Sequence, residues 1–234
     1  MLTAILWDYD GTLSDTPVKN IAVTKEVLRR LDPSLLDPMP EALTSLAAYQ
    51  KANHAYKNWR ELYLRAYAVP ESRLDEAGAL WGPCQLADKT LPPLFDGLPA
   101  ALRALRPVPM GICSQNSAGN IRAALAAHGV GECFAAVAGH DDVPWTAQKP
   151  DPAAFLLCLD KMGLSSGRFA YVGDHAGDVV FGKNAQAALR ARGAEASVFC
   201  VAAAWSGADP SGWAVRPDAV ARTPAELVEI LRAC

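Results

Sequence analysis

Two carboxylates end the first apolar run of the chain. Asp8 and Asp10 follow Ile5-Leu6-Trp7 and lead into Gly11-Thr12. Residues two apart on an extended strand project to the same side, and two like charges at that spacing require a cation or a shared proton. Carboxylate oxygens are hard ligands of the kind that Mg²⁺ takes. Taken alone, the pair is equally compatible with a turn whose aspartate caps the next helix.

Further polar residues follow other apolar runs in the same way. Ser114 comes directly after residues 108–113 and precedes a helical pattern, and a hydroxyl beside the free N–H groups of a helix N-terminus suits an anion. Lys149 precedes a proline. The run 169–172 leads into Asp174, and Asp178 follows four residues later, which would place both carboxylates on one face of a helix.

Each of these residues also has a purely structural interpretation. Ser114 could be a simple helix cap, Lys149 a surface residue and Asp178 an acid in the first turn of a helix. Thr12 could form hydrogen bonds within its own loop, and His175 carries little signal of catalysis. The case for a site therefore depends on the whole set occurring together.

The elements that would position these residues form an alternating pattern. Short apolar runs, typical of parallel strands covered on both faces, lie at 4–7, 108–113, 134–138, 169–172 and 197–202. Between the last four lie helical patterns at 117–128, 151–162 and 178–192. This predicts an α/β fold, a doubly wound, Rossmann-like parallel sheet. Ligands in such sheets bind outside the carboxyl ends of the strands, where the polar residues fall.

A second module is predicted near the N-terminus. Residues 15–90 contain helical patterns at 17–31, 41–67 and 72–88 and no strand candidate. We therefore expect an all-helical cap domain over 15–90, inserted into a core domain made of 1–14 and 91–234.

Composition narrows the classes of function. The chain has 234 residues, 51% of them apolar, and a formal net charge of −3 without a basic stripe, so we expect no nucleic-acid partner. No segment has the length of a membrane span, and we expect a cytoplasmic protein, monomer or homodimer, that acts on a small molecule. The six cysteines are scattered, which predicts neither a zinc site nor a disulfide framework.

The ordered set of motifs resembles the haloacid dehalogenase superfamily of phosphohydrolases. It is most similar to the phosphoglycolate-phosphatase-like branch with a helical cap, and the similarity extends over nearly the whole chain. The set comprises Asp8-Tyr-Asp10-Gly-Thr12, Ser114, Lys149-Pro and Gly-Asp174-x-x-x-Asp178. The resemblance implies that the strand before Asp8 lies centrally, between the strands that end at Ser114 and Asp174.

The resemblance also implies a role for each site residue. Asp8 would be the nucleophile and form an aspartyl phosphate, and Asp10 would be the general acid and base. Ser114 and Lys149 would hold phosphoryl oxygens. The metal would be Mg²⁺, bound by Asp8, the backbone carbonyl of Asp10 and Asp174, with Asp178 as a ligand or as a partner of the ligands.

Two positions depart from the family pattern. Asparagine commonly follows the hydroxyl residue of the second motif directly, whereas Gln115 intervenes here and Asn116 comes one position later. Gln186 replaces a glycine that usually ends the helix after Asp178, so the helical pattern continues toward Gly193. The role of Asn116 and the register of the last strand stay open at this point.

The sequence therefore predicts a Mg²⁺-dependent phosphatase that hydrolyses a small phosphorylated metabolite. A phosphomutase of the β-phosphoglucomutase type is the first alternative, and a non-catalytic binding protein with the same fold is the second. Asp10 disfavours a dehalogenase, since a halide leaves without a proton, and also a phosphonatase, which resembles this set but lacks the acid at that position.

Overall fold

A computed structural model describes residues 1–56 and 58–234. The chain divides into two compact units, one made of Met1–Asp15 and Pro93–Cys234 and the other of Thr16–Pro92. The first unit contains a parallel sheet of six strands in the order β3-β2-β1-β4-β5-β6, the order of a doubly wound Rossmann sheet. The predicted fold class is confirmed. The strands are β1 (Ala4–Trp7), β2 (Met110–Cys113), β3 (Ala136–Ala138), β4 (Gly167–Gly173), β5 (Ala196–Ala203) and β6 (Ala219–Ala221).

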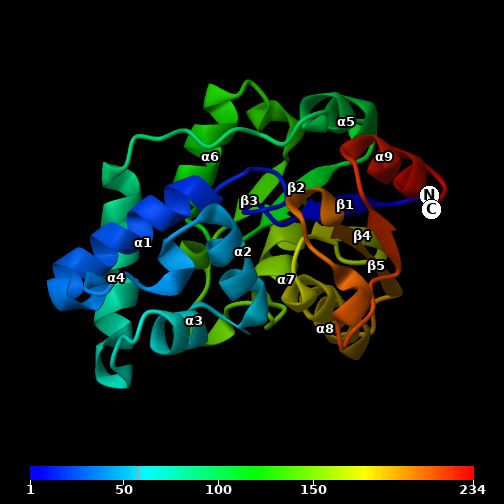
Figure 1. Ribbon diagram of the computed structural model, residues 1–234. Coiled ribbons are helices and arrows are strands. Elements are labelled where there is room, and N and C mark those ends of the chain that lie inside the picture. The colour runs from blue at the N-terminus through cyan, green and yellow to red at the C-terminus, as the bar shows by residue number, and fades with distance from the viewer. Residues whose placement is uncertain (57) are drawn as a thin grey trace. The chain divides into compact units, whose positions relative to one another are not determined.

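Helices cover both faces of this sheet (Figure 1). One face carries α5 (Leu98–Leu105), α6 (Ala118–Ala127) and α9 (Pro224–Arg232), and the other carries α7 (Ala153–Lys161) and α8 (Ala176–Ala191). Side chains alternate along β1, so this strand packs against the helices on both faces of the sheet. Ile5 and Trp7 pack on the first face, and Ala4 and Leu6 pack on the second. All four side chains are buried, which anchors the strand that carries Asp8.

β1 lies at the centre of the sheet, as the resemblance implied. It pairs with β2 on one side and with β4 on the other, Trp7 lying opposite Ile112 and Val172. The Asp8 N–H donates to the Val172 carbonyl at 2.8 Å, so the ladder reaches the first residue of the site. The carboxyl ends of the three strands therefore meet at one edge.

Two segments of the core meet again where the second unit is inserted. Ser14 and Leu94 form an isolated antiparallel bridge, and the Asp15 N–H donates to the Pro93 carbonyl at 2.9 Å. The chain thus leaves the core and returns to it at neighbouring points.

The helix that contains Asp178 is long, as its sequence pattern indicated. α8 continues through Gln186 to Ala191 and is followed by Gly193, whose φ of +80° is a conformation that favours glycine. The Gln186 side-chain oxygen accepts a hydrogen bond from the Val198 N–H at 2.9 Å. This residue therefore ties the helix to β5, which pairs with β4 over its length.

The second unit is built from helices, as predicted, and has its own core. Its α-helices are α1 (Pro17–Leu31), α2 (Leu46–Ala55), α3 (Trp59–Ala66) and α4 (Leu74–Ala87), and its described residues contain no strand. Buried members of the core include Val27, Leu28 and Tyr63. The predicted helical range 41–67 is divided, since Ser45 and Asn58 cap separate helices α2 and α3. Position 57 lies outside the described residues.

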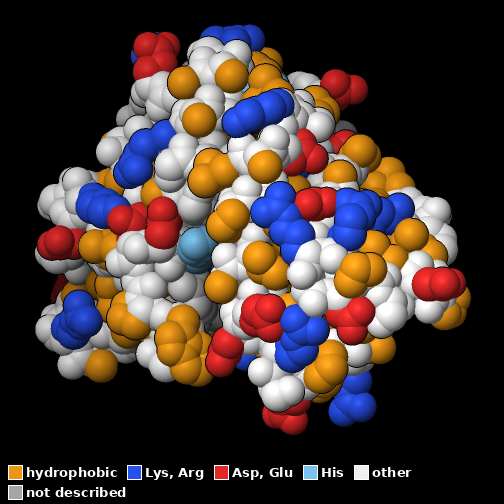
Figure 2. All heavy atoms as spheres, turned by 90° about the vertical axis from the view of Figure 1, so that its left-hand side faces the viewer, with side chains coloured by type: hydrophobic (Ala, Val, Ile, Leu, Met, Phe, Trp, Pro, Cys, Tyr) orange, Lys and Arg blue, Asp and Glu red, His pale blue; other side chains and the backbone are white. Residues whose placement is uncertain are grey.

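The surface carries charges of both signs. On the face shown in Figure 2, basic and acidic side chains are interspersed, in keeping with 22 Lys and Arg residues against 25 Asp and Glu residues. Within the described part of the chain, no helix combines the length and the apolar character that crossing a bilayer requires.

Candidate active site

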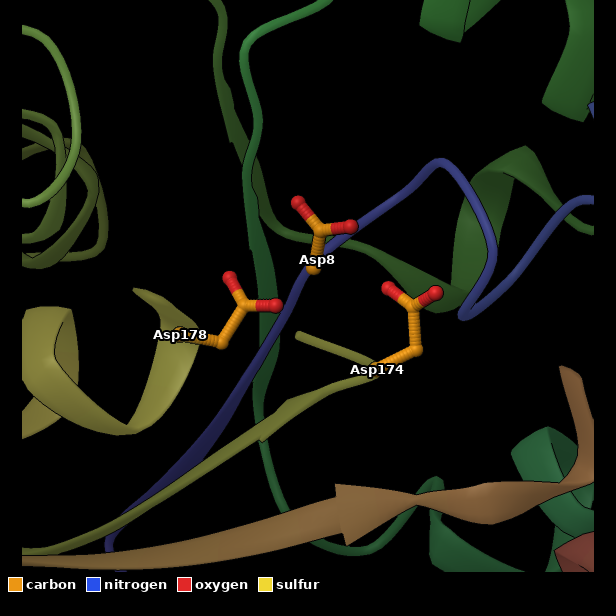
Figure 3. A group of neighbouring side chains, drawn as sticks. All are labelled: Asp8, Asp174 and Asp178. Carbon is orange, nitrogen blue, oxygen red and sulfur yellow. The ribbon is translucent and has the colours of Figure 1, made fainter. Parts of the chain in front are cut away.

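Three carboxylates converge at the carboxyl edge of the sheet. Asp8 follows β1, Asp174 follows β4, and Asp178 lies in the first turn of α8; one oxygen of each lies within 4.8 Å of the others. Figure 3 shows the three side chains facing a common space. Their exposed fractions are only 8%, 9% and 6%. Asp174 and Asp178 do not share a helical face, because α8 begins at Ala176, after Asp174. The turn from strand to helix brings them together instead.

Two glycines make room for these carboxylates. A Cβ on Gly173 would collide with the Asp178 side chain, and a Cβ on Gly11 would collide with the Asp174 carboxylate. Gly11 also has a φ of +75°, which disfavours any side chain. The close approach of backbone to carboxylate therefore requires glycine at both positions.

His175 shapes the same turn through its backbone and its ring. Its N–H donates to Asp178 Oδ2 at 3.1 Å, and its Nδ1 accepts from the Gly177 N–H at 3.0 Å. Together these two bonds cap the N-terminus of α8. The geometry gives His175 a structural role at the helix start.

Lys149 lies between two of the three carboxylates. Its ammonium group donates to Asp8 Oδ1 at 2.6 Å and to Asp178 Oδ1 at 3.0 Å. The same group lies 5.2 Å from the ring centroids of Tyr171 and Phe181, within cation–π range. Packing on all sides leaves its side chain 10% exposed. The lysine is therefore fixed as a buried counter-charge beside Asp8.

The protonation equilibria reflect the excess of negative charge. Burial raises the pKa of Asp8 well above its usual value, repulsion from Asp178, Asp174 and Asp10 adds to this, and Lys149 opposes it. Burial alone would lower the pKa of Lys149, but the carboxylates of Asp178 and Asp8 outweigh it and raise that pKa. The three clustered carboxylates thus outnumber the one ammonium group beside them. A divalent cation with a preference for oxygen would relieve the imbalance, so the donor set fits Mg²⁺.

Asp10 is oriented by an amide. Asn116 Nδ2 donates to both carboxylate oxygens of Asp10, at 3.3 and 3.2 Å. The Asn116 oxygen accepts from the Ser117 N–H and from the Asn120 amide, which fixes the orientation of the side chain. Asn116 is a site residue whose function sequence reasoning left open, and its offset by one position does not prevent it from reaching Asp10.

Ser114 directly follows β2, the strand that pairs with β1. Its N–H donates to the Ala138 carbonyl at 3.0 Å, and its hydroxyl oxygen accepts from the Asn116 N–H at 3.1 Å. The cap of α6 is Ser117, whose side chain accepts from the Asn120 N–H. Ser114 is therefore not the helix cap, and the structural interpretation of this residue as an N-cap is wrong.

Sequence reasoning missed two contacts from the segment after β5. Trp205 Nε1 donates to the Thr12 carbonyl at 3.0 Å, and the Ser206 hydroxyl donates to Asp174 Oδ2 at 3.4 Å. Thr12 itself is fully buried and its hydroxyl donates to Asp174 Oδ1 at 3.4 Å. The available signal for Trp205 and Ser206 was that they come shortly after the apolar run 197–202, much as Asp8, Ser114 and Asp174 follow theirs.

Comparison with known proteins places the chain in a family. The sequence model of the haloacid dehalogenase-like hydrolases matches residues 2–186. The chain belongs to this family. A phosphoglycolate phosphatase from Rhodospirillum rubrum is 30% identical over 191 residues, which are 79% of this chain and 77% of the relative. The resemblance inferred from the motifs is therefore confirmed.

Solved structures show the same fold as this haloacid dehalogenase-like chain. A proposed phosphoglycolate phosphatase from Lactobacillus plantarum superposes with a TM-score of 0.76 and 19% identity, over 98% of this chain and 99% of the other. CbbY from Rhodobacter sphaeroides, crystallised in complex with phosphate, gives a TM-score of 0.69 and 18% identity over 97% and 96% of the two chains. At these identities the similarity extends to the fold alone.

Proposed function

We propose that the protein is a Mg²⁺-dependent phosphomonoesterase that hydrolyses a small phosphorylated metabolite through an aspartyl phosphate on Asp8. The observation that supports this best is the environment of Asp8. A buried carboxylate lies 2.6 Å from a buried ammonium group and beside two further carboxylates. Lys149 and a bound divalent cation would favour the ionised form of Asp8. In this buried position the carboxylate could then attack phosphorus with little competition from water.

Asp8 attacks phosphorus in the proposed reaction, and the bond from phosphorus to the ester oxygen breaks. Asp10, oriented by Asn116, donates a proton to the departing oxygen. Asp10 then takes a proton from the water that hydrolyses the aspartyl phosphate, which restores Asp8 and releases inorganic phosphate. An alkoxide leaves poorly without that proton, whereas a halide needs none, so Asp10 favours phosphate chemistry over dehalogenation.

Lys149 and Ser114 are assigned to the phosphoryl group. Lys149 donates to Asp8 and would offer its positive charge to the oxygens of a phosphoryl group bound beside that carboxylate. Ser114 directly follows β2, the neighbour of β1, and supplies a hydroxyl at the same edge. Asp8, Asp174, Asp178 and the Asp10 carbonyl would hold Mg²⁺, which when bound offsets the repulsion between an anionic nucleophile and an anionic substrate.

The 30% identical relative makes 2-phosphoglycolate the first substrate to test. We propose an assay of inorganic phosphate release on a panel of phosphorylated metabolites that includes it, with Mg²⁺ and with excess chelator. Phosphate release that requires Mg²⁺ is the expected result. Full activity in chelator would contradict the metal site, and transfer of phosphate between positions of a sugar without net release would indicate a phosphomutase instead.

A further inference from the structure

The segment after β5 contacts the carboxylate cluster from outside the motifs. It begins with a short 3₁₀ turn, Ala204–Ser206, beyond the residues 2–186 that the family model matches. Trp205 reaches the Thr12 carbonyl and Ser206 reaches the Asp174 carboxylate. One turn thus contacts both the loop after β1 and the carboxylate after β4.

Asp174 is held by a hydroxyl on each oxygen. Thr12 Oγ1 lies 3.4 Å from Oδ1, Ser206 Oγ lies 3.4 Å from Oδ2, and Gly11 closes the side where a Cβ would collide. Both distances exceed the usual range of O–H···O bonds. Each hydroxyl thus makes a long contact with one carboxylate oxygen, and an ionised carboxylate with about four lone-pair positions can accept such contacts and still bind a cation.

Trp205 fixes the position of one of those hydroxyls. The indole N–H donates to the Thr12 carbonyl at 3.0 Å, and the ring packs against the core cluster on the α5, α6 and α9 face. An indole has a single donor and a rigid ring, so the bond sets where Thr12 lies. Thr12 lies four residues from Asp8, in the loop that also carries Asp10.

From this geometry we propose that Trp205 and Ser206 are positioning residues that pre-orient Asp174 and thereby give the cluster its preference for Mg²⁺ over Ca²⁺. The inference rests on the metal site of the proposed function. Mg²⁺ demands nearly ideal octahedral geometry, whereas Ca²⁺ accepts variable ligand positions. A loosened Asp174 therefore weakens Mg²⁺ binding more than Ca²⁺ binding.

The test is calorimetric titration of the metal-free full-length protein with Mg²⁺ and with Ca²⁺, which is independent of catalysis. Ser206→Ala removes the hydroxyl and Trp205→Phe removes the N–H while keeping an aromatic ring. We expect each to weaken Mg²⁺ binding by about 10-fold or more, the usual effect of losing a partner of a metal ligand, with a smaller change for Ca²⁺. Ser206→Thr, which keeps the hydroxyl, should restore Mg²⁺ affinity.

Matched controls are available in the next turn of the chain. Ser211→Ala and Trp213→Phe remove the same groups from the turn Pro210–Gly212 and from the residue after it, where Trp213 packs against the α7 and α8 face. These variants should bind both cations like the wild type.

The possible outcomes separate the two proposals. A wild type that does not bind Mg²⁺ overturns the metal site of the proposed function and the inference with it. A wild type that binds Mg²⁺, together with Ser206→Ala and Trp205→Phe variants that match it, overturns the inference alone. Equal losses of Mg²⁺ and Ca²⁺ affinity also overturn it, because they show no effect on selectivity.

Discussion

At the scale of single residues, Asp8 is the position on which the proposed chemistry depends. Asp8→Asn keeps the size of the side chain and removes the nucleophile, so we expect a folded protein whose phosphatase activity is close to background. The measurement is phosphate release in saturating Mg²⁺, with circular dichroism as the control for folding. A variant that retains more than about a hundredth of wild-type turnover would contradict a covalent mechanism at Asp8.

Asp10 can be tested through the nature of the leaving group. Asp10→Asn removes proton transfer, typically worth about 10² to 10⁴ in rate. The loss should be smaller for aryl phosphates than for alkyl phosphates, because a phenolate leaves with less need of a proton. Asn116→Ala, which removes the amide that donates to Asp10, should show the same pattern with a smaller loss. Equal losses on both ester classes would assign Asp10 a structural role.

The residue types that end strands were predictable from sequence, but their partners were not. Asp8, Ser114 and Asp174 could be chosen because a polar side chain directly after a buried strand lies at the ligand-binding edge. Ser206 was missed because its contact with Asp174 depends on the path of the chain after β5. Such a contact between residues 32 positions apart has no local signature.

At the scale of elements, the start of α8 combines stability with site geometry. His175→Ala removes the ring nitrogen that accepts from the Gly177 N–H, and loss of a cap costs about 1 kcal/mol. We expect the free energy of unfolding in urea to fall by roughly that amount. Any loss of phosphatase activity should be equal for alkyl and aryl phosphates, unlike the loss expected for Asp10→Asn. A His175→Ala variant that discriminates between alkyl and aryl phosphates as Asp10→Asn does would show that the ring takes part in proton transfer.

Elements escaped prediction where their sequence signals were short or ambiguous. β6 has three residues, Ala219–Ala221, flanked by Asp218 and Arg222, whereas the equally short β3 lies in the longer apolar run 134–138. α5 begins at Leu98 with Pro99 in its first turn, a position that favours proline. Glycine and proline are also common in loops, so Gly97 and Pro99 do not by themselves distinguish a helix start from a connection.

At the scale of the whole molecule, the carboxylate cluster links metal binding to stability. In the proposed metal site, Mg²⁺ would bind the folded state preferentially, because only folding assembles Asp8, Asp174 and Asp178. At a Mg²⁺ concentration 100 times the dissociation constant, binding would add about 2.7 kcal/mol to the free energy of unfolding. This corresponds to a rise in Tm of roughly 5–10 °C for a chain of this size. Differential scanning calorimetry with Mg²⁺ and with chelator measures the shift.

Asp174→Asn provides the matched control for that shift. Without metal, the variant relieves part of the repulsion among three buried carboxylates, so its Tm in chelator should equal or exceed that of the wild type. Its response to Mg²⁺ should be largely lost. A Tm shift as large as that of the wild type would show that Mg²⁺ binds elsewhere.

The bridge between Ser14 and Leu94 has a consequence for how this architecture can vary. The core itself holds together the two points between which the helical unit is inserted, through the bridge and the bond from Asp15 to Pro93. Closing the loop between these points therefore adds little entropic cost as the insert lengthens, since that cost grows only with the logarithm of its length. Modules of different size and shape can accordingly be exchanged at this junction while Asp8 and Asp10, a few residues upstream, keep their positions.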